Sequence, residues 1–380
     1  MIMDKRTYAM LAKPASSACN LRCEYCYYTG KKERLHVENS RMPQGILEAY
    51  TRQSLAMHGS DAVVEFAWHG GEPTIAGIPF FEEALRLQRE YGKGRKILNT
   101  LQTNATLLTD AWCQFFKANN FLIGVSIDGP EPLHNVYRLT ADGRGSFTET
   151  IRGIELLQRH GVSFNTLTTV NRKNMEKPLE VYRFLREFSD YMQFLPVVER
   201  MPAQYETEEG QPFATPPGLH SIKIKHPLAD FSVTPEGYGA FLCAIWDEWK
   251  KYDSMEKHIQ LFDVTIGNLN GIPSSLCVHN PLCGHSGCVE ANGDVYSCDR
   301  YAFPAYKLGN LTLTSLGVLM EKNRDFGMHK TYGLPEECFD CRYIKLCFGG
   351  CPKDRLWDNK NYLCAGYKMF FDKVCNSTER

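Results

Sequence analysis

Short apolar runs alternate with longer amphipathic stretches along the first half of the chain. The apolar runs predict six strands, at 8–13, 62–68, 96–103, 121–127, 162–170 and 191–197. Between them apolar residues recur at helical spacing, which predicts helices at about 43–58, 79–91, 108–119, 147–160 and 175–189. Thr109 and Ser146 stand at the starts of two of these helices as candidate N-caps. Strands that alternate with helices form parallel βαβ units, so the pattern predicts an α/β fold around a parallel sheet.

The alternation stops near residue 200. Residues 200–235 contain six prolines, which fit either a surface linker or a loop that folds over the mouth of the α/β domain and shapes a peptide groove. An aromatic-rich helix is predicted at about 236–252, and from Leu276 onward the chain becomes cysteine-dense, with short strands and loops expected. These changes predict three parts: an α/β domain at 1–235, a connecting helical segment at 236–275, and a small cysteine-rich domain at 276–380.

Composition narrows the class of protein further. The chain has 380 residues and a formal net charge of −1, so no strong field for nucleic acid or a membrane surface is indicated. Residues 1–7 lack the apolar core of a secretory signal, and no uncharged apolar run approaches the ~20 residues of a membrane span. A cytoplasmic location is therefore predicted, where thiols stay reduced. The 15 cysteines then indicate metal ligands rather than disulfides.

Three cysteines after the first predicted strand carry the sharpest chemical signal. Cys19, Cys23 and Cys26 have the spacing C-x3-C-x2-C, with Tyr25 just before the third and no fourth cysteine nearby. Three thiolates can hold three irons of a four-iron cluster, which leaves the fourth iron open to a small molecule. An open coordination position also distinguishes catalytic from structural zinc sites. A structural zinc site or a coincidence of spacing is the alternative that the motif alone leaves open.

With its aromatic flanks and the strand before it, this motif resembles that of the radical S-adenosylmethionine (SAM) enzymes. The resemblance implies a partial (β/α)6 barrel whose chemistry lies at the carboxyl ends of the strands. It also implies a [4Fe–4S] cluster on Cys19, Cys23 and Cys26, whose open iron binds SAM and generates a 5′-deoxyadenosyl radical.

The same resemblance implies a set of SAM-binding residues. They are Tyr25, Gly70, Gly71, Glu72, Ser126, Arg138 and Val198. The glycines and Glu72 belong to the element Gly-Gly-Glu-Pro, and His69 before it stands where many relatives have glutamine. The chemistry of Arg138 agrees with a role toward the SAM carboxylate, because a guanidinium pairs with a carboxylate through two hydrogen bonds.

Eight further cysteines form a second set near the C-terminus. They are Cys277, Cys283, Cys298, Cys338, Cys341, Cys347, Cys351 and Cys364. Eight thiolates are enough for two sites of four ligands each, and from spacing alone these sites could hold zinc or iron–sulfur clusters. The pattern resembles the SPASM domain of radical SAM enzymes that modify peptides, a module with two auxiliary [4Fe–4S] clusters. The resemblance implies that Cys277, Cys283, Cys298 and Cys351 hold auxiliary cluster I, and that Cys338, Cys341, Cys347 and Cys364 hold auxiliary cluster II.

Asp299, directly after Cys298, is the candidate catalytic residue. The alternative is an aspartate in a turn, or one paired with Arg300. The Cys-Asp pair, the following Tyr301 and Leu308-Gly-Asn310 most resemble the anaerobic sulfatase-maturating enzymes, and this resemblance covers essentially the whole chain. Those enzymes oxidise a cysteine or serine in a Cys/Ser-x-Pro-x-Arg segment of a sulfatase to Cα-formylglycine. Asp299 would accept the thiol or hydroxyl proton, and an auxiliary cluster would accept the electron.

This resemblance also implies partners and leaves alternatives. The substrate would be an unfolded or nascent sulfatase polypeptide, and an external one-electron reductant of the flavodoxin or ferredoxin type would be needed. No nucleic acid or membrane partner is implied. The main alternative is a SPASM maturase that crosslinks another ribosomally made peptide, but such enzymes commonly carry an N-terminal recognition domain, for which the first strand near residue 8 leaves no room. A metal-binding scaffold without turnover is the non-enzymatic alternative.

Overall fold

A computed structural model describes residues 9–28, 41–199, 228–356 and 359–378. All six predicted strands are confirmed, each within two residues of its expected bounds. They are β1 (Ala9–Ala12), β2 (Val64–Trp68), β3 (Ile97–Thr103), β4 (Leu122–Ser126), β5 (Phe164–Val170) and β6 (Tyr191–Pro196). Most of the proline-rich stretch at 200–235 lies outside the described residues, so both interpretations of it stay open.

The five helices predicted between these strands are also confirmed. They are α2 (Gln44–Ala56), α3 (Ile78–Gly92), α4 (Asp110–Ala118), α6 (Phe147–Arg159) and α7 (Pro178–Arg186), with a short α5 (Glu131–His134) between β4 and α6. Thr109 caps α4 as expected, because its hydroxyl oxygen accepts a hydrogen bond from the Trp112 amide at 3.4 Å. Ser146 stands at the N-cap position of α6 as expected, but its side chain makes no capping hydrogen bond, because its hydroxyl donates to the carbonyl oxygen of Arg138 at 2.8 Å.

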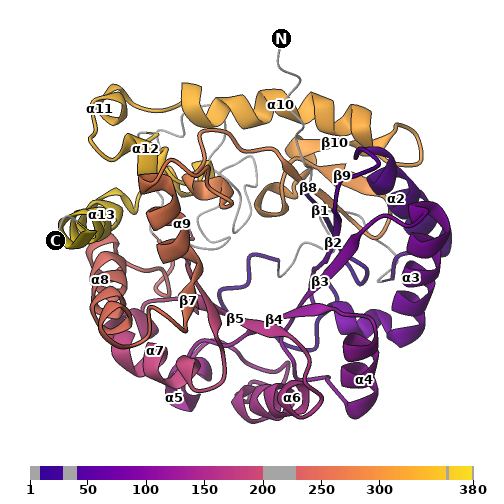
Figure 1. The fold of residues 1–380 in the computed structure, drawn as a ribbon, viewed down its shortest axis with the longest axis horizontal. Coiled ribbons are helices and arrows are strands. Elements are labelled where there is room, and N and C mark those ends of the chain that lie inside the picture. The colour runs from indigo at the N-terminus through magenta and orange to yellow at the C-terminus, as the bar shows by residue number, and fades with distance from the viewer. Residues whose placement is uncertain (1–8, 29–40, 200–227, 357–358, 379–380) are drawn as a thin grey trace.

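The strands form one sheet that curves into a partial barrel, with its helices on the outside (Figure 1). The strand order is β10-β9-β8-β1-β2-β3-β4-β5-β6-β7. Neighbouring strands from β1 to β7 (His258–Ile259) are parallel. On the other side of β1 the parallel strand β8 (Ser286–Val289) follows, and β9 (Asp294–Tyr296) and β10 (Lys307–Asn310) pair antiparallel. The predicted class, a partial (β/α)6 barrel followed by a small cysteine-rich module, is confirmed.

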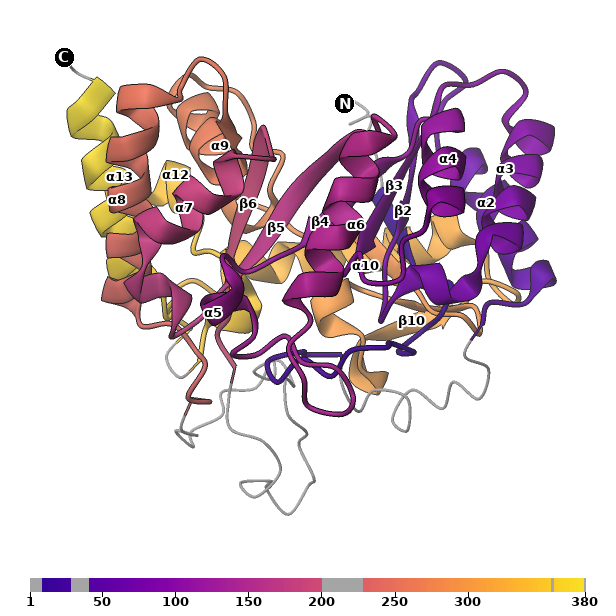
Figure 2. The same cartoon turned by 90° about the horizontal axis from the view of Figure 1, so that it is seen from below.

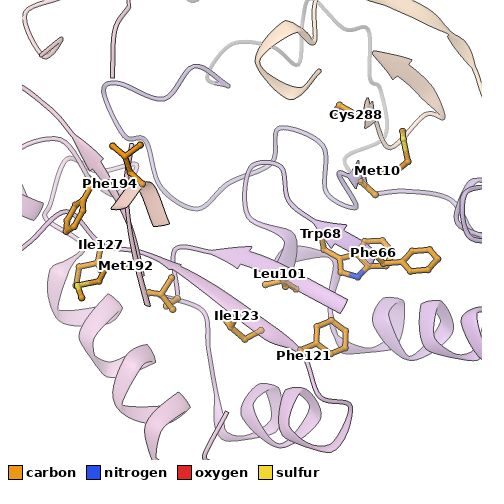
Figure 3. Close-up of a cluster of buried hydrophobic side chains, with 14 of the residues drawn as sticks. Met10, Phe66, Trp68, Leu101, Phe121, Ile123, Ile127, Met192, Phe194 and Cys288 are labelled. Carbon is orange, nitrogen blue, oxygen red and sulfur yellow. The ribbon is translucent and has the colours of Figure 1, made fainter. Parts of the chain in front are cut away.

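The two faces of the barrel sheet differ in character. The face toward the helices is apolar and buried, and Figure 3 shows its side chains Met10, Phe66, Trp68, Leu101, Ile123 and Met192. The opposite face carries polar side chains: Thr100 donates to Glu65 at 2.9 Å and Gln102 donates to Ser126 at 2.9 Å. Because small closed barrels usually fill their interior with apolar side chains, this polar inner face is suited to a polar ligand.

The cysteine-rich module is more helical than its sequence indicated. It contains α10 (Leu316–Tyr332) and α13 (Cys364–Thr378), besides the short helices α11 (Glu336–Phe339) and α12 (Ile344–Cys347). The expectation of only short strands and loops was therefore wrong. The buried face of α10 includes the polar residues Asn323 and Lys330, so its apolar spacing is irregular and gives a weak helical signal.

The connecting segment packs against this module. The predicted helix α8 (Pro235–Tyr252) lies beside α13 in both Figure 1 and Figure 2, and α9 (Gln260–Leu269) follows β7. The division into parts at 1–235, 236–275 and 276–380 stays a prediction. No helix among the described residues has the length and apolar character that a membrane span requires.

Candidate active site

The predicted site residues gather where the parallel strands end. Parallel strands place their carboxyl ends at one edge of a sheet, and the segments that follow β1, β2, β3, β4 and β6 all meet there. In Figure 2 the loop that follows β1, drawn in indigo, runs across the lower end of the barrel strands. This edge therefore brings the three N-terminal cysteines together with the segments that carry Gly70, Ser126 and Val198.

The loop after β1 holds its three cysteines close to one another. Burial raises the pKa of the Cys23 thiol to about 12; the charge of Arg138 opposes this rise, and the charges of Cys26 and Cys19 add to it. Asn104, at the end of β3, donates its side-chain amide to the Cys19 sulfur at 3.8 Å and to the Asn20 side-chain oxygen at 3.0 Å. The loop is thus tied to β3 by a side chain that faces the same edge.

The turn after β2 is hydrogen-bonded to the loop after β1 that carries the three cysteines, here called the cysteine loop. The amides of Gly71 and Glu72 donate to the carbonyl oxygens of Ser16 and Ala18, both at 2.8 Å. A Cβ atom at Gly71 would lie 2.2 Å from the Ala18 carbonyl oxygen, so no larger residue fits this approach. Two glycines at this position are therefore needed for the packing of the loop itself.

Glu72 is fully buried, and both of its carboxylate oxygens have donors. One oxygen accepts hydrogen bonds from the amide and hydroxyl of Thr74 and from the Thr103 hydroxyl, at 2.7–3.1 Å. The other accepts from the Asn104 amide at 2.8 Å. Burial raises the pKa of Glu72, and these hydrogen bonds oppose the rise. Glu72 thus connects the ends of β2 and β3.

Arg138 pairs with a carboxylate to which the sequence had assigned no role. Its Nε lies 3.0 Å from Oδ1 of Asp128, which is fully buried two residues after β4. The Tyr25 hydroxyl donates to the other oxygen of Asp128, and the Arg138 guanidinium lies 5.6 Å from the centre of the Tyr25 ring. The sequence did place a carboxylate directly after a predicted strand, in Ser126-Ile-Asp-Gly129, and this position could have indicated Asp128 as a site residue.

Asp299 lies in a second network of ion pairs and hydrogen bonds, between the cysteine-rich module and the cysteine loop. Its Oδ1 is 2.5 Å from Lys13 Nζ, and its Oδ2 accepts a hydrogen bond from the Tyr27 hydroxyl. Lys13 directly follows β1 and is fully buried, whereas 19% of the Asp299 side chain is exposed. The pairing with Arg300 considered above does not occur, because Arg300 instead pairs with Asp354 at 2.8 Å.

Glu290 completes this second network. It is fully buried after β8, 3.5 Å from Lys13 Nζ, and it accepts hydrogen bonds from the hydroxyls of Tyr28 and, at 3.2 Å, Ser16. Neither Lys13 nor Glu290 was predicted from the sequence to be a site residue. A lysine at the end of an apolar strand and a carboxylate after another strand were the only local signals.

The structure brings together the four cysteines that were expected to hold auxiliary cluster I. Burial raises the pKa of Cys298, and the charges of Cys277 and Cys351 raise it further. Burial also raises the pKa of Cys283 to about 12, and Cys351 and Cys277 contribute to the rise. These four thiols therefore lie near one another, although their ligation of a cluster stays a prediction.

The four cysteines expected to hold auxiliary cluster II are also near one another. Burial raises the pKa of Cys347 to about 11, and the charges of Cys364 and Cys338 add to the rise. The pKa of Cys364 is raised by burial and by Cys341. Among the described residues no three His, Cys, Asp or Glu side chains are placed to hold a single metal ion. In a four-iron cluster each thiolate binds a different iron, so its ligands do not share one ion.

Family comparisons agree with this geometry. The model of the radical SAM superfamily matches residues 14–185, and the model of SPASM, an iron–sulfur cluster-binding domain, matches residues 283–342. The partial barrel with a cysteine loop at its mouth and the cysteine-rich module thus define a radical SAM enzyme with a SPASM domain. Its cofactors are [4Fe–4S] clusters and SAM.

More specific relatives cover nearly the whole chain. It is 43% identical to the serine-type anaerobic sulfatase-maturating enzyme of Bacteroides thetaiotaomicron, over 98% of this chain and 92% of the relative. It is 34% identical to the cysteine-type enzyme of Clostridium perfringens, over 96% and 95%. A solved structure of anSMEcpe with bound AdoMet and the Cp18Cys peptide matches with a TM-score of 0.82 and 31% identity, over 97% of both chains. The chain belongs to the anaerobic sulfatase-maturating enzymes.

Proposed function

We propose that this enzyme oxidises one cysteine or serine of a sulfatase polypeptide, within a Cys/Ser-x-Pro-x-Arg segment, to Cα-formylglycine. The observation that carries the proposal is the position of Asp299, which extends from the cysteine module to Tyr27 beside the cysteine loop. Oxidation of a side chain by two electrons needs a proton acceptor near both the radical source and the electron acceptor. Relatives named for serine-type and cysteine-type maturation, and a solved relative with a bound peptide, support the same reaction.

The thiol sets fit the cofactors of this family. We assign Cys19, Cys23 and Cys26 to the cluster that binds SAM, because a set of three thiolates leaves one iron open. The two sets of four would each ligate an auxiliary cluster completely, with the assignments given above. When bound, SAM supplies the radical that removes a hydrogen atom from the target Cβ, and an auxiliary cluster supplies the acceptor for the remaining electron.

We assign the SAM contacts to the barrel edge. The amides of Gly71 and Glu72 are used by the cysteine loop, so the turn of Gly70 and Gly71 would bind the SAM amino group through carbonyl oxygens, the acceptors that an amino group needs. Arg138 uses Nε toward Asp128, and a guanidinium has further donors for the SAM carboxylate.

The remaining assigned contacts come from neighbouring strand ends. Ser126 ends β4 on the polar inner face, and Tyr25 is held in place by its hydrogen bond to Asp128. Val198 is buried two residues after β6, where its backbone would contact the adenine. With these contacts, SAM would lie along one edge of the sheet.

Asp299 is the proposed base. It accepts the proton of the substrate thiol or hydroxyl as the carbon-centred radical loses its electron, which leaves a thioaldehyde or an aldehyde. Water then hydrolyses the thioaldehyde to formylglycine. Lys13 and Tyr27 orient the carboxylate of Asp299. Because Lys13 also faces Glu290, the buried ammonium keeps an anionic partner after Asp299 takes up the proton.

Two partners complete the proposal. The substrate is an unfolded or nascent sulfatase polypeptide, which reaches the open carboxyl edge of the barrel. An external one-electron reductant of the flavodoxin or ferredoxin type supplies the electron that starts each SAM cleavage.

The proposal is tested by anaerobic reconstitution of the enzyme with iron, sulfide, SAM and a reductant. Peptides with Cys-x-Pro-x-Arg and Ser-x-Pro-x-Arg segments are added separately, and mass spectrometry follows the target residue. We expect deoxyadenosine together with an aldehyde at the cysteine or serine. Deoxyadenosine without any change in either peptide would contradict the proposal, and a thioether product would support the crosslinking alternative.

Asp299→Asn should slow formylglycine formation by ~10²–10⁴-fold while SAM cleavage continues, because an amide cannot accept the substrate proton. The measurement compares aldehyde and deoxyadenosine formation at equal iron content. Asp325→Asn, at an exposed position of α10, is the matched control and should behave as wild type. Aldehyde formation at the wild-type rate by Asp299→Asn would exclude Asp299 as the base.

A further inference from the structure

One face of α10 supports the segment 277–284, which carries two of the cysteines assigned to auxiliary cluster I. The side-chain amide of Asn323 donates to the carbonyl oxygens of Gly284 and Ser297, at 3.0 and 2.9 Å. One helical turn later, a Cβ atom at Gly327 would lie 2.1 Å from the Cys283 carbonyl oxygen, so the helix and this segment are in direct backbone contact. Residues 323, 327 and 330 have the spacing of one helix face.

Lys330 is the charged member of this face. It is fully buried, and its Nζ lies within 3.0 Å of the carbonyl oxygens of Cys277, Val278 and Asn280. An ammonium group has three N–H donors, one for each of these three carbonyl oxygens, whereas a neutral amine has only two. Burial lowers the pKa of Lys330, and the nearby thiols of Cys277 and Cys351 oppose this effect.

Arg355 is a second cation that contacts Lys330. Arg355 donates from Nη1 to the Lys330 carbonyl oxygen at 2.7 Å and from Nε to the Gly349 carbonyl oxygen at 3.2 Å. Gly349 has a φ of +70° and precedes Cys351 by two residues. Arg355 therefore ties the last turn of α10 to the loop that presents Cys351.

We propose that Lys330 is a positioning residue for auxiliary cluster I, which fixes the turn that begins at Cys277 and raises the reduction potential of the cluster. The inference rests on the ligation proposed above for that cluster. Reduction adds negative charge to a cluster, and a buried positive charge close to it stabilises the reduced form, because the protein interior screens charge weakly. The cluster beside Asp299 thereby takes up the substrate electron more readily.

The test uses the full-length chain with Cys19, Cys23 and Cys26 replaced by alanine, so that only the two auxiliary clusters are reconstituted. Iron content is measured, and a redox titration followed by electron paramagnetic resonance gives the two midpoint potentials. Lys330→Met should lower one midpoint so that the ratio of reduced to oxidised cluster at fixed potential falls on the order of tenfold, equivalent to ~59 mV for one electron. Lys322→Met, at an exposed position of the same helix, should leave both midpoints unchanged.

Each outcome decides the inference. Loss of one cluster from Lys330→Met, with the other retained, supports the positioning role. If that variant binds no iron, Lys330→Gln decides, because it keeps two N–H donors without the charge, and its midpoint should also fall. Full iron loading with unchanged midpoints overturns the inference. Fewer than the ~8 irons of two clusters in the parent chain would instead overturn the proposed ligation, and the inference with it.

Discussion

Lys13 is a fully buried lysine whose ammonium group faces two carboxylates. Asp299 lies 2.5 Å away and Glu290 lies 3.5 Å away, and the ammonium sits 3.6 Å from the centre of the Tyr28 ring. Burial opposes the charge, but Asp299, Cys288 and Glu290 raise the pKa of Lys13 well above its usual value. Removing one partner of such a buried pair leaves the other charge unpaired, which costs more than the pair itself contributes.

Lys13→Met should therefore lower the free energy of unfolding by ~3–5 kcal/mol. Because Asp299 would also lose its orientation, less formylglycine should form for each SAM that is cleaved. Urea denaturation measures the first effect, and the ratio of aldehyde to deoxyadenosine measures the second. Lys96→Met, at an exposed position, serves as the control. A urea midpoint equal to that of the control would show that the network does not stabilise the fold.

His134 is hydrogen-bonded to the backbone beside the pair of Asp128 and Arg138. Its Nδ1 accepts a hydrogen bond from the Asp128 amide at 3.4 Å, and its Nε2 lies 3.1 Å from the Ser146 hydroxyl oxygen. Because the Ser146 hydroxyl donates to the Arg138 carbonyl oxygen, it accepts from the protonated Nε2, and the ring is neutral. Burial, together with the positive charge of Arg138, lowers the pKa of His134 well below its usual value.

This lowered pKa predicts how stability depends on pH. Below about pH 6.5 the unfolded chain binds a proton at His134 that the folded chain does not, so the stability that the neutral ring contributes is lost as pH falls. The free energy of unfolding should decrease by up to ~1.4 kcal/mol per pH unit from this residue. His134→Asn should flatten the dependence, whereas replacement of the exposed His329 should not. A slope that persists in His134→Asn would assign the effect to other groups.

At the scale of elements, the packing of α13 against α8 connects the barrel to the cysteine module. α13 begins with Cys364, and a Cβ atom at Gly366 would lie 2.1 Å from the carbonyl oxygen of Pro235, the first residue of α8. Gly239 faces the same contact, since its Cβ would lie 2.7 Å from the Gly366 Cα. The two helices thus meet backbone to backbone, which positions Cys364.

Gly366→Ala should destabilise the fold by ~1–3 kcal/mol, because the added methyl group forces the two helices apart. It should also reduce iron loading, since Cys364 is displaced from the other three thiols of its set. The melting temperature and the iron content of the reconstituted enzyme measure these effects. Gly45→Ala in α2 is the matched control, because its Cβ would meet no atom within 4 Å, and it should be neutral or slightly stabilising. Equal behaviour of the two variants would contradict the proposed role of this contact.

At the scale of the whole molecule, a single sheet joins the two segments that separate family models match. β1 pairs with β2 on one side and with β8 on the other, in the register Leu11 to Cys288 and Ala12 to Val289. The module that carries Asp299 therefore supplies one of the two neighbours of β1, the strand that precedes the cysteine loop. The barrel and the module are coupled through the backbone as well as through Lys13.

A chain that ends at residue 275 should not form a stable barrel. It would leave β1 without its partner β8, Lys13 without Asp299 and Glu290, and α8 without α13. Limited proteolysis and urea denaturation would compare this fragment with the full chain, and we expect rapid cleavage and no cooperative transition. A sharp transition in the fragment would show that the barrel folds independently.

Patterns that depend on nearby residues could be predicted well. The strands and helices of the barrel followed from apolar spacing, because each element buries one face against its neighbours. The positions of both N-cap residues followed from the sequence. The capping hydrogen bond forms at Thr109 but not at Ser146, because the carbonyl oxygen of Arg138 competes for the Ser146 hydroxyl. α10 was not predicted because its buried face includes Asn323 and Lys330, which break the apolar spacing. Their side chains make hydrogen bonds to the loops that carry cysteines instead of packing against apolar residues.

The spacing of Cys19, Cys23 and Cys26 was enough to predict the class of chemistry, because cluster ligands on one loop are determined by short-range geometry. Which groups surround that chemistry depended on the tertiary structure. Lys13 meets Glu290 and Asp299 only because β8 pairs with β1, and Asp128 meets Arg138 only because the segment after β4 folds back over the barrel edge. Such pairs form only when the chain folds, so no local pattern encodes them, and burial makes each charge depend on its partner.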